Sequence, residues 1–112
     1  LDIDDGNHVI SGQLEFEGIK GWPVTRLSPG AMGPFRLLPR IQCLHGILSL
    51  DHGLTGKVSF YGEDISFSGG RGYIEKDWGH SFPTTYLWLQ SNHFEQPGIS
   101  IFATIANIPW FS

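Results

Sequence analysis

The sequence predicts an all-β domain whose strands form an antiparallel meander. Its 112 residues include 15 Gly and 7 Pro, which divide the chain into short segments. Apolar and polar residues alternate in these segments, as they do in half-buried strands, and no segment shows the 3.6-residue period of a helix. This length suits one domain. We therefore expect residues 1–112 to form a single β-rich domain within a larger chain.

In the N-terminal third of the chain, two predicted strand pieces precede a long loop. Residues 1–6 are acidic and turn-like, and residues 8–17 alternate as a half-buried strand. A break at residues 18–22 leads to a short edge strand at residues 23–27. Residues 28–39 contain five Gly or Pro, which excludes a regular helix and predicts a loop. Its apolar residues suit a loop that folds over a site.

The rest of the chain predicts a series of strands joined by tight turns. The expected strands are residues 41–50, 57–61, 65–68, 72–78, 84–94 and 99–108. The expected turns are residues 51–53, 62–64, 69–70 and 96–98. Strands of this length with Gly or Pro turns are typical of an antiparallel meander, and we expect about seven strands and little helix.

The composition excludes some classes of function. Charged residues make up 16% of the chain, against about 25% in an ordinary domain, which indicates either an apolar cavity or a face covered by another part of the chain. The net charge is −4 and the Lys and Arg residues are scattered, which argues against nucleic acid as a partner. No apolar run reaches about 18 residues, so no membrane-spanning segment is expected.

The most chemically dense stretch is residues 69–94. On a strand at residues 72–78, Tyr73, Glu75 and Asp77 share one face, and the two carboxylates lie about 6.6 Å apart along the strand. Carboxylates this close oppose each other's ionisation, so one of them can stay protonated near neutral pH and act as a general acid. The alternative is an ordinary solvated face with a weak ion pair.

The following strand carries rings and amides on one face. Alternation places Tyr86, Trp88, Gln90, Asn92 and Phe94 together. Such a surface suits an apolar small molecule with one polar end. The alternatives are that the rings belong to the core and that the amides bond to the backbone.

The sequence predicts no metal site and no cofactor. The histidines lack i, i+2 or HExxH spacing among themselves, and the single Cys43 has no CxxC partner, so a buried thiol is expected. Ser81 is not in a Gly-x-Ser-x-Gly elbow. The turn at residues 69–72 lacks the Lys and Ser or Thr of a phosphate loop. His80, three residues after Asp77, is either a base or an exposed histidine.

The central run GYIEKDWGHSFPTTYLWLQSNHF resembles the tocopherol cyclase family. Its match is that family's Glu-Lys-(Asn/Asp)-Trp-Gly-x-x-Phe-Pro stretch, followed by a Trp-x-Gln-x-Asn strand. The segments CLHGILSLDHGLTGKVSFYGEDISF and GAMGPFRLLPR upstream and IFATIANIPW downstream also resemble it. The resemblance covers about residues 30–110.

The resemblance implies a lipocalin-like β architecture, a half-barrel or open barrel in a longer chain with two such halves, similar to carotenoid hydratases. It implies protonation of a prenyl double bond, then capture of the tertiary cation by a ring hydroxyl to close a chromanol. The implied acids are Glu75, which we prefer, and Asp77. The implied substrate-binding residues are Trp78, Tyr86, Trp88, Gln90, Asn92, Lys76 and His80, the rings stabilising the cation and the amides holding the hydroquinone oxygens.

Other functions stay open at this point. The same cavity would suit a non-catalytic, lipocalin-like binder of a lipid or isoprenoid, and a half-domain could serve only as a scaffold. The expected partners are an apolar small molecule with a polar head, a membrane surface, and the remainder of the chain or a partner half.

Overall fold

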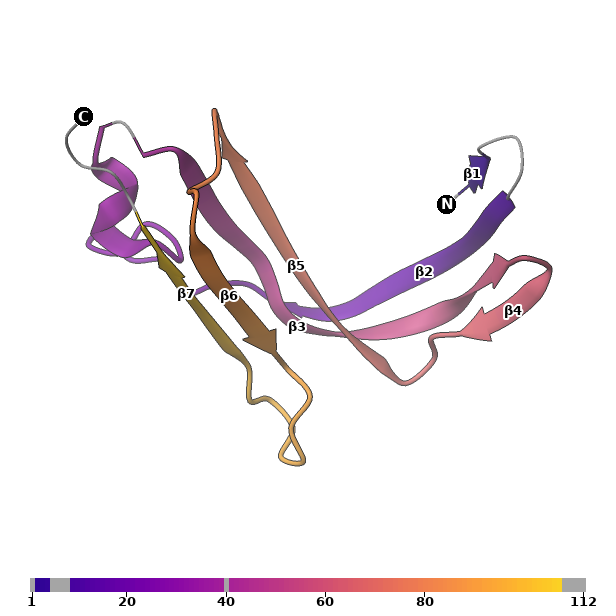
Figure 1. The fold of residues 1–112 in the computed structure, drawn as a ribbon. Helices are drawn as coiled ribbons and strands as arrows, with labels where there is room; N and C mark the ends of the chain where they lie inside the picture. Colours follow the sequence, from indigo (N-terminus) through magenta and orange to yellow (C-terminus); the bar gives the residue numbers. More distant parts are fainter. Residues whose placement is uncertain (1, 5–8, 40, 108–112) are drawn as a thin grey trace.

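The computed structural model describes residues 2–4, 9–39 and 41–107, and their fold is all-β (Figure 1). The described residues contain seven strands and one 3-10 helix. In chain order these are β1 (Asp2–Asp4), β2 (Val9–Lys20), η1 (Gly33–Leu37), β3 (Cys43–Phe60), β4 (Glu63–Ser66), β5 (Gly70–Gly79), β6 (Tyr86–Ser91) and β7 (Ile101–Ala106). Every strand pairing is antiparallel. The predicted all-β class and antiparallel arrangement are confirmed.

The long strand β3 organises the larger sheet. It pairs with β2 on one edge, and with β4 and then β5 on the other. Register shifts interrupt the β3–β5 pairing between residues 47 and 52 and the β2–β3 pairing between residues 17 and 20. Such irregularities bend a strand, and the sheet is bent accordingly into two arms (Figure 1). The described part of the sheet does not close into a barrel, which fits the expected open half-barrel.

Several local predictions for the strands were wrong. The break expected at residues 18–22 begins later, because β2 continues through Lys20. The turn expected at residues 51–53 is strand, because β3 runs continuously through it. The side chain of Asp51 bonds to Arg71 on β5, and that of His52 bonds to Ser49 within β3. The edge strand expected at residues 23–27 is absent, because Thr25 and Ser28 exchange backbone hydrogen bonds of 3.0 and 3.2 Å with each other. The turn expected at residues 1–6 is wrong for residues 2–4, which form β1 and pair with β2, while residues 1, 5 and 6 lie outside the described residues. The expected start of the first long strand at residue 8 and the expected end of the last strand at residue 108 also lie outside them.

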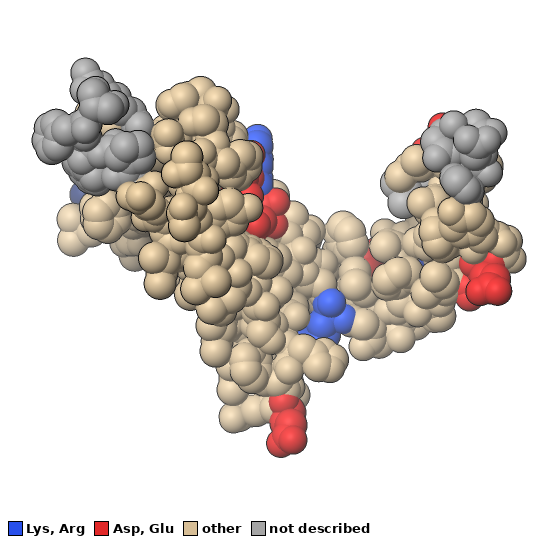
Figure 2. Space-filling model, viewed as in Figure 1, with Lys and Arg blue, Asp and Glu red and all other residues tan. Residues whose placement is uncertain are grey.

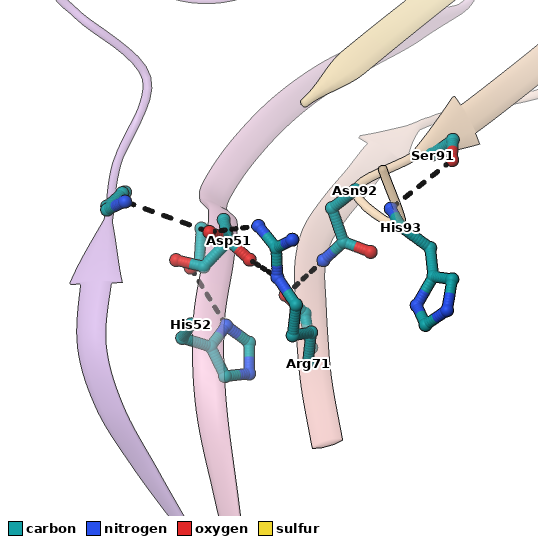
Figure 3. Close-up of polar contacts among 9 residues, drawn as sticks. Asp51, His52, Arg71, Ser91, Asn92 and His93 are labelled. Carbon is teal, nitrogen blue, oxygen red and sulfur yellow. Dashed lines mark hydrogen bonds and ion pairs between the residues drawn. The ribbon is translucent and has the colours of Figure 1, made fainter. Parts of the chain in front are cut away.

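A buried polar group occupies the bend (Figure 3). Arg71 on β5 donates two hydrogen bonds, of 2.8 and 2.6 Å, to the carboxylate of Asp51 on β3. The side chain of Asp51 is 10% exposed. The hydrogen bonds from Arg71 are the largest influence on the pKa of Asp51 and hold it below the ordinary value. Beside it, Ser49 Oγ and His52 Nδ1 are 2.9 Å apart, and both residues are buried.

Strands β6 and β7 form a separate two-stranded sheet that lies beside the β5 arm (Figure 1). Asn92, just after β6, donates a 2.8 Å hydrogen bond to the carbonyl of Gly72 on β5 (Figure 3). This bond joins the two sheets at one end. The hairpin is therefore held against the face of β5 that carries Tyr73, Glu75 and Asp77.

The apolar core is small. Among the described residues, the buried hydrophobic ones are Cys43, Ile47 and Val58, and many larger apolar side chains are exposed. The radius of gyration is 17.5 Å, whereas a compact domain of this length has about 13 Å. Figure 2 shows a hollow between the two arms and few charged side chains on the visible face. In the described part of the chain, no helix is both long and apolar enough to cross a bilayer.

Candidate functional site

Glu75 and Asp77 open onto one pocket between β5 and the β6–β7 hairpin. The alternation of β5 places both on the same face, as the sequence predicted. The pocket has a volume of about 190 Å³. Its lining, besides these two carboxylates, is His45, Phe82, Pro83, Tyr86, Trp88, Thr104 and Ala106. Four of the residues expected to form the site, namely Glu75, Asp77, Tyr86 and Trp88, are therefore together.

Glu75 is held by donors from two strands. Tyr73 on β5 donates its hydroxyl to Glu75 Oε2 at 2.7 Å, and the indole nitrogen of Trp88 on β6 donates to the same oxygen at 3.2 Å. The Tyr73 and Trp88 ring centroids are 6.4 Å apart, edge to face. Burial first, and then the hydrogen bond to Glu75, raise the pKa of Tyr73, so this hydroxyl stays a donor.

Asp77 is paired with a histidine that the sequence analysis did not assign to the site. His45 lies directly opposite Asp77 in the β3–β5 register, and its Nδ1 is hydrogen-bonded to Asp77 Oδ1. The two side chains are 19% and 25% exposed. This pair depends on the register between β3 and β5. Residue spacing within one strand does not predict that register.

A larger pocket of about 610 Å³ adjoins the first. His45, Pro83, Thr104 and Ala106 line both pockets. The remaining wall is mostly apolar and comes from the loop around η1, from the start of β3 and from β7: Ser28, Ala31, Met32, Gly33, Pro34, Phe35, Ile41, Gln42, Cys43, Phe102 and Ile105. The loop at residues 28–39, which was expected to fold over a site, lines this larger pocket. The two pockets together form an apolar compartment with acidic groups at one end.

Comparison with known proteins decides the family. The sequence profile described as tocopherol cyclase-like matches residues 4–108. The chain belongs to the tocopherol cyclase-like family.

Two plant members of this family illustrate how much of the chain is shared. A tocopherol cyclase, chloroplastic, of Zea mays is 41% identical over 46 residues, which is 41% of this chain and 9% of that protein. A probable tocopherol cyclase, chloroplastic, of Oryza sativa subsp. japonica is 38% identical over 52 residues, or 46% of this chain and 10% of that protein. The chain thus spans about a tenth of the length of these tocopherol cyclase relatives. No solved structure matches the chain.

Several residues of the tocopherol cyclase-like motif lie outside both pockets. Lys76 and Trp78 are on the opposite face of β5, where the Lys76 ammonium is 5.8 Å from the Trp78 ring centroid. His80 is exposed, and its backbone nitrogen donates to the carbonyl of Gln42 at 3.1 Å. Asn92 holds the backbone of Gly72, and Gln90 Nε2 is buried without a hydrogen-bond partner among the described residues. The structure therefore does not bring these five residues together with the two acids.

Cys43 is close enough to the acids to respond to them. The residue is 6% exposed, and it lies two positions before His45 on β3. Burial, followed by the negative charges of Asp77 and Glu75, raises the pKa of its thiol. The buried thiol that the sequence predicted is confirmed, and it borders the site.

Proposed function

We propose that the chain catalyses the acid-initiated cyclisation of a prenylated hydroquinone. The observation that supports this most is the joining of an acidic pocket to a larger apolar one. A ring with hydroxyl groups suits the smaller, polar end, and a prenyl chain suits the larger pocket. The names of the plant relatives point to the same chemistry.

Glu75 is the proton donor in this proposal. Protonating a carbon–carbon double bond requires an acid whose conjugate base is stabilised. The hydroxyl of Tyr73 and the indole N–H of Trp88 both donate to Glu75 Oε2, and donors of this kind favour the carboxylate that remains after the proton has left. Both bonds reach the same oxygen, so Oε1 is the atom that carries the proton.

The Asp77–His45 pair takes up the proton of the ring hydroxyl. Glu75 protonates the less substituted carbon of the double bond, which leaves a tertiary cation on its neighbour. The ring oxygen bonds to that cation while its proton passes to the pair. One C–H and one C–O bond form, and one O–H bond and the C=C π bond are lost. The reaction is an isomerisation that needs no oxidant or reductant.

The pocket wall suits a cationic intermediate. The rings of Tyr86 and Trp88 line the pocket, and a ring contributes about 0.5–2 kcal/mol to a nearby cation. Among the described residues that line the two pockets there is no Lys or Arg. No fixed positive charge from these residues therefore opposes the developing charge.

Kinetics of two variants test this assignment. Glu75→Gln and Asp77→Asn keep the shape of each side chain and remove its acid–base function. Each should lower the turnover of a prenylated hydroquinone by at least about 100-fold, the usual contribution of a positioned acid or base. Glu63→Gln, on an exposed strand of the other arm, is the matched control and should keep wild-type turnover.

Two results would contradict the proposal. Turnover that survives both substitutions would remove the acid–base assignment. Tight binding of the hydroquinone by the wild-type protein, with no chromanol formed, would instead favour a non-catalytic binder of the same ligand class.

A further inference from the structure

The face of β3 that borders the pockets carries a third donor beside the His45–Asp77 pair. Cys43 and His45 are two positions apart on β3, so their side chains point to the same side of the sheet. Asp77 faces His45 across the β3–β5 ladder, and Gly79 faces Cys43. The thiol sulfur, a ring nitrogen of His45 and a carboxylate oxygen of Asp77 all lie within 4.8 Å of one another. The spacing of the histidines did not predict this cluster, because only one of its three members is a histidine.

We propose that Cys43, His45 and Asp77 form a binding site for a divalent cation of the zinc class. Thiolate, imidazole and carboxylate are the three ligand types that zinc takes in proteins. A thiolate and a carboxylate together balance a charge of two, which suits a half-buried position. Zinc bonds of about 2.0–2.3 Å hold neighbouring ligand atoms roughly 3.5 Å apart, so small side-chain rotations close the present arrangement.

The site has an open coordination position toward the pockets. Three protein ligands and one free position are typical of catalytic zinc, whereas structural zinc usually has four protein ligands. Cys43 lines the larger pocket, Asp77 the smaller, and His45 both. The fourth position therefore faces the compartment, where it takes water or an oxygen of a bound ligand.

The surroundings favour a cation. Glu75 lies two residues before Asp77 on the same face of β5 and is a second carboxyl group beside the cluster. Among the described residues that line the two pockets there is no Lys or Arg, and the Lys76 ammonium lies over Trp78 on the opposite face of β5. The backbone nitrogen of His45 donates to the sulfur of Met32 at 3.2 Å, which fixes the backbone that carries two of the ligands.

The cation site does not depend on the cyclisation proposed above. With the cation bound, Asp77 and His45 are metal ligands and do not take up the proton of the ring hydroxyl, so the metal-bound protein should not perform the cyclisation proposed above. Metal binding without turnover of the hydroquinone would support the cation site alone. Turnover of the hydroquinone by a protein that binds no metal would support the cyclisation alone.

Cobalt binding tests the site directly. We expect the metal-free protein to bind one Co²⁺ and to develop a thiolate-to-cobalt charge-transfer band with visible bands of a tetrahedral ion, all displaced by an equivalent of Zn²⁺. Cys43→Ser should abolish the charge-transfer band. His45→Gln and Asp77→Asn should weaken Co²⁺ binding by at least tenfold, since losing even an outer partner of a metal ligand costs about 10-fold. His93→Gln, which changes an exposed histidine, should leave binding unchanged.

A crystal soaked with Zn²⁺ provides a second measurement that needs no variant. Anomalous scattering should place the metal within bonding distance of the Cys43 sulfur, the His45 ring and the Asp77 carboxylate. The proposal is overturned if the wild-type protein shows no thiolate–cobalt band, if His45→Gln and Asp77→Asn bind like wild type, or if the metal lies elsewhere in the crystal.

Discussion

Glu75 receives two hydrogen bonds on one oxygen, from Tyr73 on its own strand and from Trp88 on the neighbouring hairpin. The bonds orient the carboxyl group toward the pocket and also tie β5 to β6. Tyr73 does not line either pocket, so it positions the acid without touching the substrate. Its loss should therefore affect the rate more than the binding of the hydroquinone.

Tyr73→Phe tests this positioning role. The change removes one donor to a charged group, worth about 1.5 kcal/mol, so kcat should fall roughly tenfold while KM stays near the wild-type value. Steady-state kinetics with a prenylated hydroquinone measure both constants. An unchanged kcat, or a rise in KM alone, would contradict the role. Trp22→Phe, an aromatic change outside both pockets, is the control.

At the residue scale, the sequence predicted the acidic face correctly because strand alternation is a local property. Tyr73, Glu75 and Asp77 share a face in any strand with that register. His45 was missed because its contact with Asp77 depends on how β3 aligns with β5, more than thirty positions along the chain. Lys76 and Trp78 belong to the same motif, but alternation already placed them on the other face.

At the element scale, the strands of the second half were predicted largely where they occur, and the long continuity of β3 was not. Asp51 and His52, followed by glycine, are typical turn residues. They are accommodated inside a strand because Arg71 bonds to Asp51 and Ser49 bonds to His52. The bend of the sheet therefore contains a polar group that joins β3 to β5 through Asp51 and Arg71.

Asp51→Asn should destabilise this bend. Breaking a buried ion pair costs roughly 3 kcal/mol, and the free energy of unfolding from urea titrations should fall accordingly. Asp64→Asn breaks the exposed Lys57–Asp64 pair and serves as the matched control, with no measurable change. Equal effects of the two substitutions would contradict the structural role of Asp51.

The same pair predicts a pH dependence. Arg71 lowers the pKa of Asp51, so the pair stabilises the fold fully above the ordinary carboxyl pKa of about 3.9. This stabilisation is lost as the pH falls through the lowered, folded-state value. The stability difference between wild type and Asp51→Asn should therefore shrink as the medium becomes more acidic, which urea titrations at several pH values measure. A difference that grows on acidification would contradict this sign.

At the scale of the whole molecule, the described chain exposes more apolar surface than a soluble monomer normally does. Leu87, Ile105 and Leu27 are 58%, 70% and 87% exposed, and the radius of gyration exceeds that of a compact domain. The low charge content predicted either a cavity or a covered face; the structure shows an apolar pocket and exposed apolar side chains. We expect other polypeptide to cover the exposed face.

The isolated 112 residues should therefore associate. Sedimentation velocity should show a weight-average mass that rises with concentration, and a hydrophobic dye should bind strongly. Leu87→Asp and Ile105→Asp, on the exposed hairpin, should reduce both signals. A chain that stays monomeric at high concentration and binds no dye would contradict this expectation.

In the proposed function, Glu75 delivers a proton to a double bond inside the acidic pocket. The most direct measurement is conversion of a prenylated hydroquinone in heavy water, followed by mass spectrometry and NMR of the product. We predict one deuterium per chromanol, on the carbon next to the one that has bonded to oxygen, and at least about 100-fold slower product formation by Glu75→Gln. A chromanol without solvent deuterium, or an equal yield from Glu75→Gln, would contradict the account.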